Sequence, residues 1–259
     1  HCWNRGGHGN VNMADAIAQS CDVYFYEIAL RLGIEKIAET AKLLGFGSYY
    51  DEYFGVPKSI VPNKKWKSDN YNENWQKGET LNVGIGQGFL LSTPLELAVM
   101  TANLINGGKI IRPNIIKFLP GYSILDVPIT KYNNFKLEHL SIIKDAMFKV
   151  VNTSKGTAWK SRTLDKDYSI SGKTGTSQVR IISAEERASG IIKNKDLPLS
   201  KRDHALFIGF APYDKPRYIT AVVLEHAGGG SASAAPIGRD LLIAARKIIE
   251  GIDTKNTVS

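Results

Sequence analysis

Residues 168–178, YSISGKTGTSQ, constrain the fold more than any other stretch of the chain. They begin like a β-strand, yet Lys173 stands between two glycines where a core strand carries bulky side chains. Glycine in a strand lets another backbone come close, and an edge strand can accept a further strand. A bound peptide is therefore expected alongside, with Lys173 beside it and the Thr174 and Thr176 hydroxyls as donors. The stretch predicts a site for an extended peptide that ends in a carboxylate.

Two nucleotide-binding motifs are excluded by single positions. A phosphate-binding loop built on Gly172-Lys173-Thr174 requires glycine at position 167, which is Asp167. Residues 82–88, NVGIGQG, lack the third glycine of a dinucleotide fingerprint because the next residue is Phe89. Neither segment is therefore expected to bind a nucleotide cofactor.

The composition is that of a globular protein. With 259 residues, 43% hydrophobic and 22% charged, the chain can bury a sizeable core as one domain or as a domain with a small lobe. The net charge is +8 and the pI about 9.3, but the basic residues are scattered among acids, which favours a solvated surface over nucleic-acid binding. There is no apolar run of membrane-spanning length. Because the chain starts at His1 without a signal segment, we expect it to begin inside a larger protein.

The first 45 residues predict helices that meet at a polar junction. Asn12, followed by Asp15, is typical of a helix start, and the predicted helix reaches Ser20. Apolar stretches at 23–32 and 34–44 then predict helical segments, each ending at a glycine. Ser20 and Asp22 are therefore placed between helices, where a serine and an acid most often serve as caps.

The rest of the chain predicts an antiparallel sheet flanked by helices. The expected elements are a loop-like wall at 47–81, helices at 93–106 and 136–151, an exposed connection at 179–203, strands at 205–211 and 218–225, a helix at 234–249 and a polar tail. The two strands read as a hairpin, and the strand within 168–178 is expected antiparallel at its side. The fold class is therefore α/β, of the α+β kind.

Two motifs carry a family resemblance. Ser20-x-Asp22 and, far downstream, Lys173-Thr174-Gly175-Thr176 resemble two of the three motifs of the penicillin-recognising serine enzymes. Other segments are similar, in order, to the transpeptidase domain of class B penicillin-binding proteins, especially the penicillin-binding protein 2 group. These segments are residues 2–3 with 7–9, 84–88 with 93–98, 151–152 with 156–158, and 207–212. The resemblance covers nearly the whole chain and implies the penicillin-binding, β-lactamase-like transpeptidase fold.

The third motif of that family is missing. The family nucleophile is the serine of S-x-x-K, and no such tetrad precedes Ser20. Residues 141–144, SIIK, match by chance inside a predicted amphipathic helix, and residues 68–70, SDN, spell the second motif inside the predicted loop. We therefore expect residues 1–259 to be a partial transpeptidase domain that lacks its N-terminal part with S-x-x-K.

The resemblance implies a peptidoglycan D,D-transpeptidase that cross-links D-Ala-D-Ala stem peptides during cell elongation and is a target of β-lactams. Ser20 would take part in the proton route, and Lys173 would hold positive charge beside it. Asp22 stands where asparagine is commoner, so it accepts hydrogen bonds or balances a lysine but donates none. Substrate binding would fall to Thr174, Gly175 and Thr176, with the Thr176 backbone N–H as an oxyanion donor.

The same resemblance implies partners and a location. The expected partners are stem peptides, β-lactams and a membrane glycan polymerase of the elongation machinery, with no nucleic acid. The expected location is the periplasmic face of the bacterial inner membrane, through an anchor outside this chain. The alternatives are a non-catalytic penicillin-binding sensor or peptide-binding module, and a β-lactamase.

Three residues of the types that bind zinc lie within residues 2–21. Cys2, His8 and Cys21 are expected to converge, and a structural zinc takes four such ligands, so a fourth would come from upstream. A Cys2–Cys21 disulfide and two buried thiols are the alternatives. No cofactor is expected to be required for catalysis.

Overall fold

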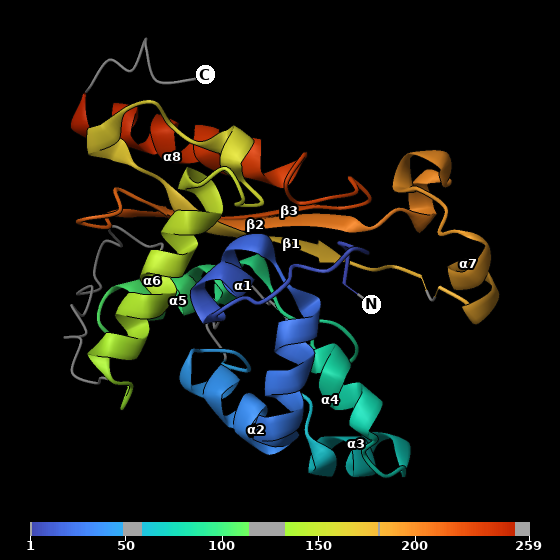
Figure 1. Cartoon of the computed structure of the whole chain (residues 1–259). Helices are drawn as coiled ribbons and strands as arrows, with labels where there is room; N and C mark the ends of the chain where they lie inside the picture. Colours follow the sequence, from blue (N-terminus) through green and yellow to red (C-terminus); the bar gives the residue numbers. More distant parts are fainter. Residues whose placement is uncertain (1, 49–58, 114–132, 181, 252–259) are drawn as a thin grey trace, which may run out of the picture.

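The computed structural model describes residues 2–48, 59–113, 133–180 and 182–251 (Figure 1). Its helices are α1 (Met13–Gln19), α2 (Asp22–Leu43), α3 (Lys64–Tyr71), α4 (Lys77–Gly84), α5 (Pro94–Ile105), α6 (Leu137–Asn152), α7 (Ala184–Ser189) and α8 (Ala234–Glu250). The strands are β1 (Ser171–Ser177), β2 (His204–Ala211) and β3 (Tyr218–Leu224). None of the helices in these ranges combines the length and apolar character needed to cross a membrane.

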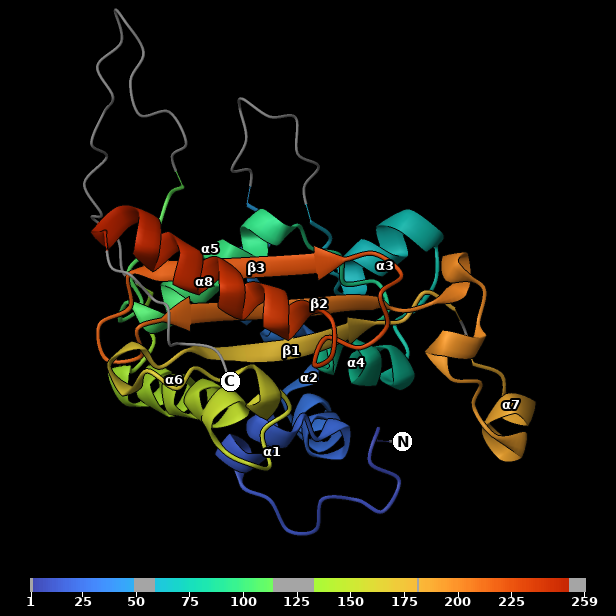
Figure 2. The same cartoon turned by 90° about the horizontal axis from the view of Figure 1, so that it is seen from above.

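The three strands form one antiparallel sheet in the order β1-β2-β3. Helix α8 covers one face, and α5, α1 and α2 lie on the other side (Figure 1). Seen from above, α6 runs beside β1 at the border of the sheet (Figure 2). The predicted hairpin, its antiparallel neighbour and the covering helix at the C-terminal end are therefore confirmed.

The glycines of the sheet make room for one aromatic ring. Phe207, which is 1% exposed, lies between the sheet and α8. A β-carbon added to Gly172, Gly209 or Gly238 would come within 2.4, 2.6 or 2.3 Å of this ring. We expected the strand glycines to admit another backbone. At Gly172 the space instead goes mainly to the Phe207 ring and to the neighbouring β2 carbonyl, because β1 and α8 are pressed against the same side chain.

The first two helices meet as the sequence predicts. The Asn12 side chain accepts a hydrogen bond from the Asp15 N–H and starts α1. Helix α1 ends at Gln19 with Ser20 as its cap, α2 starts at Asp22, and Gly33 has φ 74° and a non-helical backbone within α2. The polar junction at Ser20 and Asp22 is confirmed.

The loop predicted at 47–81 is wrong in its second half, which contains α3 and the start of α4. Helix α3 is so polar that it lacks the apolar period by which a helix is recognised. Its stability comes from a cap, since Asn63 accepts from the Trp66 N–H, and from packing of Trp66 against Phe89. Lys67 is buried beside it and pairs with acids outside α3. Residues 49–58 lie outside the described ranges.

Other boundaries differ by small amounts. Strand β1 starts at Ser171, not at Tyr168, because residues 166–168 form a 3-10 turn whose buried tyrosine donates its hydroxyl to the Leu242 carbonyl. The connection at 179–203 is mostly irregular but contains α7. The predicted polar tail lies outside the described residues.

Candidate active site

The α1–α2 junction places Ser20 next to the sheet. Its backbone is left-handed, with φ 53° and ψ 57°, which is costly for a residue with a β-carbon and persists only where neighbours enforce it. The Trp3 indole N–H points at the Gln19 and Ser20 carbonyls, 3.0 and 3.1 Å away. The N-terminal segment thus holds Ser20 in its unusual conformation.

Lys173 of β1 reaches this junction. Its Nζ donates to Ser20 Oγ at 2.9 Å, across 153 residues of sequence, and to the Thr174 carbonyl at 2.7 Å. Burial lowers the pKa of Lys173 to about 8, and the negative charge of Asp22 partly offsets that effect. A lysine with such a pKa can carry charge or exchange a proton near neutral pH.

Asp22 opens α2 and accepts a hydrogen bond from the Trp3 backbone N–H, 3.2 Å from Oδ2. The expectation that Asp22 acts as an acceptor agrees with this contact. Its charge acts on Lys173 through space, as the pKa effect indicates. Asp22 therefore helps to hold the N-terminal segment and keeps Lys173 closer to its charged form.

Thr174 and Thr176 lie on the opposite face of β1 from Lys173, as strand alternation requires. The Thr174 hydroxyl is 2.7 Å from the Thr157 hydroxyl, and the Thr157 carbonyl accepts from Ser231. At Gly175 a second backbone does come close, because a β-carbon on Gly230 would lie 2.3 Å from the Gly175 carbonyl oxygen. Thr176 is exposed at the end of the strand.

Sequence reasoning missed two residues of this region. Thr157 follows α6 and Gln87 follows α4, and both lie in segments that carried the resemblance without a role of their own. Gln87 donates from Nε2 to the Thr176 carbonyl at 2.7 Å. The available signal was the pair of glycines around Gln87, which indicates a turn that presents a side chain.

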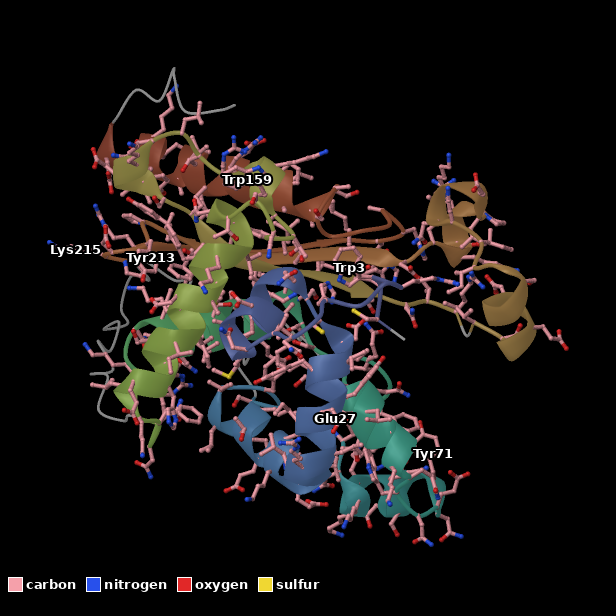
Figure 3. All side chains as sticks on the ribbon, viewed as in Figure 1. Trp3, Glu27, Tyr71, Trp159, Tyr213 and Lys215 are labelled. Carbon is pink, nitrogen blue, oxygen red and sulfur yellow. The ribbon has the colours of Figure 1, made fainter. Side chains whose placement is uncertain are left out.

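Neither of the two chance motif matches, SIIK at 141–144 and SDN at 68–70, contributes to the site. Ser141 is exposed on α6, and Lys144 packs over the Tyr213 ring, 4.8 Å from its centroid. Tyr213 and Trp3 lie well apart in Figure 3. The SDN stretch lies on α3, where Asp69 pairs with Lys65, instead of in the predicted loop.

Cys2, His8 and Cys21 converge as predicted. One ligand atom from each lies within 4.8 Å of the others. Both cysteines are free and buried, so the disulfide alternative does not hold. Cys2 Sγ lies 3.5 Å from His8 Nδ1, and the buried His8 Nε2 has no hydrogen-bond partner among the described residues. The set therefore offers three donors of the kinds that zinc prefers.

Comparison with known proteins agrees with this geometry. Residues 1–243 match the family model of the penicillin binding protein transpeptidase domain. The chain is 36% identical over 245 residues to the peptidoglycan D,D-transpeptidase MrdA of Haemophilus influenzae, covering 93% of this chain and 37% of the relative. MrdA of Acinetobacter baumannii is also 36% identical, with 91% and 35% covered. The chain thus spans little more than a third of these relatives' length.

Solved structures share the fold. Pseudomonas aeruginosa PBP2 in complex with WCK 5153 superposes with a TM-score of 0.81 at 33% identity, over 100% of this chain and 53% of that one. Helicobacter pylori PBP2 in complex with MreC gives 0.80 at 30% identity, over 96% and 43%. The expected fold class, a transpeptidase fold with an antiparallel sheet flanked by helices, is confirmed. The chain belongs to the penicillin-binding protein transpeptidase family, within the class B group of penicillin-binding protein 2.

Proposed function

We propose that this chain is the C-terminal part of the transpeptidase domain of a peptidoglycan D,D-transpeptidase, which cross-links D-Ala-D-Ala stem peptides during cell elongation and is acylated by β-lactams. The observation that carries the proposal is the contact of Lys173 Nζ with Ser20 Oγ at 2.9 Å. Two sequence motifs from distant elements thereby meet at the border of a sheet. The names of the MrdA relatives support the same reaction.

The proposed reaction transfers an acyl group and needs no cofactor. The serine of an upstream S-x-x-K attacks the carbonyl of the penultimate D-alanine, a C–O bond forms, and the C–N bond to the last D-alanine breaks. The Ser20 hydroxyl passes the released proton to the departing amine. Lys173 donates to Ser20 Oγ and supplies positive charge beside it.

Substrate binding is assigned to Thr174, Gly175 and Thr176. In this proposal Thr157 donates to the Thr174 hydroxyl, which leaves the Thr174 proton free to bind the terminal carboxylate of the peptide. The outward backbone N–H of Thr176 binds the developing oxyanion, and the N–H of the absent serine is the second donor.

The direct test compares two lengths of the protein. A chain extended upstream to include S-x-x-K is expected to form a stable adduct with fluorescent penicillin, whereas residues 1–259 alone form none. Mass spectrometry locates the adduct. An adduct on Ser141, or on any other residue of the 259-residue chain, would sink the assignment of an upstream nucleophile.

Location and partners follow from the same proposal. We place the protein at the periplasmic face of the inner membrane, with an anchor outside this chain. The Helicobacter pylori relative was solved with MreC, and another similar structure comes from a peptidoglycan synthase complex that coordinates polymerization and crosslinking. Both support a partner in the elongation machinery, including a glycan polymerase. Co-purification of the full-length protein with such a polymerase tests this partnership. If crosslinked membranes yield the full-length protein without a polymerase, the partnership is wrong.

A structural zinc at Cys2, His8 and Cys21 is the second proposal. Two thiols and an imidazole fit the preference of zinc, and the unpartnered His8 Nε2 is the type of atom that a metal would satisfy. The ion would fix the segment that holds Ser20. Metal analysis of the extended protein, with Cys21→Ser as the control, is expected to find one zinc per chain that the variant loses. Purified protein without zinc, prepared without chelator, would end this proposal.

A further inference from the structure

The outer side of β1 is the place where a peptide would add to the sheet. Strand order is β1-β2-β3, and within the described ranges no strand pairs with the outer side of β1. Backbone groups of successive residues point alternately toward β2 and away from it. The contacts of Thr176 and Gln178 with Gln87 identify the outward set as residues 172, 174, 176 and 178.

Outward carbonyls at three positions along this strand and its lead-in already have side-chain donors. Asn152 Nδ2 donates to the Ile170 carbonyl at 2.8 Å, and Lys173 Nζ donates to the Thr174 carbonyl at 2.7 Å. Gln87 Nε2 donates to the Thr176 carbonyl at 2.7 Å. Side-chain caps of this kind block an unwanted strand, yet here they lie where a substrate strand must pair.

Gln87 makes the most complete of these caps. While Nε2 donates to the Thr176 carbonyl, Oε1 accepts from the Gln178 N–H at 3.2 Å. One carboxamide thus makes both kinds of hydrogen bond that a paired strand would make. Gly86 and Gly88, with φ 75° and 73°, form the turn that presents it. The half-buried Gln87 side chain therefore occupies the place of a peptide group.

We propose that Gln87 is a specificity-determining residue that competes with the acyl-donor peptide for the Thr176 carbonyl. The ligand class is an acyl donor with a secondary amide at the donor residue, as in a stem peptide or an acylamino β-lactam. The donor N–H displaces Nε2, so one hydrogen bond replaces another and little affinity is gained. This inference rests on the proposed function, because the Thr176 N–H is the proposed oxyanion donor.

The test measures binding without chemistry. The extended chain, with its S-x-x-K serine replaced by alanine, is titrated by NMR with a D-Ala-D-Ala peptide and with the same peptide N-methylated at the donor amide. Gln87→Met keeps the side-chain length but removes both hydrogen bonds. It is expected to strengthen binding of the secondary amide about fivefold, the value of one hydrogen bond, and to leave the N-methyl peptide unchanged.

Asn152→Ala is the matched control, because it removes the same kind of cap from the Ile170 carbonyl, one residue before the start of β1. It is expected to change the two affinities by the same factor. If Gln87→Met leaves the ratio of affinities unchanged, or weakens both peptides alike, the role of Gln87 is wrong. Acylation of the serine-containing chain is measured separately, so a protein that binds with the expected ratio but is never acylated contradicts only the proposed function.

Discussion

Two lysines of this chain have little access to water but opposite surroundings. The Lys67 side chain is 4% exposed and contacts both Glu73, at 3.2 Å, and Glu79. The hydrogen bond to Glu79 is the main reason why the pKa of Lys67 is raised. Lys173 contacts a hydroxyl and a carbonyl, and burial lowers its pKa to about 8. Removing a buried lysine from its paired acids destabilises a fold, whereas a buried lysine with only neutral acceptors is suited to proton chemistry.

The largest effect is expected from removing the second lysine. Lys173→Ala in the extended protein should slow acylation by fluorescent penicillin by about 100-fold or more, because the charge beside Ser20 is lost. Its melting temperature should change little, since no acid is left unpaired by a direct contact. Stopped-flow acylation and thermal unfolding measure the two quantities. An unchanged rate would show that β1 is not in the site.

Removing Lys67 should have the opposite effects, lowering the stability and leaving acylation unchanged. Lys67→Ala leaves Glu73 and Glu79 without their cation and is expected to lower the free energy of unfolding clearly more than the surface control does. Acylation per folded molecule should stay unchanged. Lys65→Ala is the control, because Lys65 pairs with Asp69 on the surface of α3 and should cost less than about 1 kcal/mol. Equal losses in urea unfolding would remove the distinction between the two lysines.

The pH dependence sharpens the contrast. Acylation is expected to fall above pH 8 as Lys173 loses its proton, and Asp22→Asn should move that fall to lower pH, because the Asp22 charge raises the pKa. The contribution of Lys173 to the free energy of unfolding should instead increase with pH. The folded pKa lies below the unfolded value of 10.5, so the unfolded chain binds more protons between these values and stability rises with pH there. A rate profile that is flat through pH 8 in both proteins would contradict the assignment.

The smallest effect concerns the hydroxyl pair behind the strand. Thr157→Val removes the partner of the Thr174 hydroxyl and should raise the KM for a donor peptide about fivefold with little change in kcat. Thr157→Ser keeps the hydroxyl and should restore the wild-type KM. If serine and valine behave alike, Thr157 has a packing role only.

Sequence reasoning succeeded where the signal is local. The predicted start of α5 depends on Thr93, Pro94 and Glu96, which form a capping box with proline in the first turn. The Asn12 cap of α1 and the β2–β3 hairpin are equally local. Each depends on residues that are neighbours in the chain.

Other features depend on distant residues and escaped prediction. Helix α3 has no apolar period, since its stability comes from a cap, an aromatic contact and the acids around Lys67. Gln87 acquires its contacts only when the turn after α4 lies against β1. The pairing of Ser20 with Lys173 came from a family resemblance, because nothing local to either residue specifies it. Long-range packing decides these details.

Close packing around the Phe207 ring limits how far β1, and with it Lys173, can move relative to α8. Gly172 adjoins Lys173 in β1, and Gly238 belongs to α8 on the far side of the ring. A single methyl group at Gly238 would meet the ring at 2.3 Å, so either the helix or the strand must move. Any movement of the strand carries the lysine with it. Substitutions that alter acylation of the extended protein should therefore also be sought at positions such as Gly238, which lie between the sheet and α8 and away from Ser20.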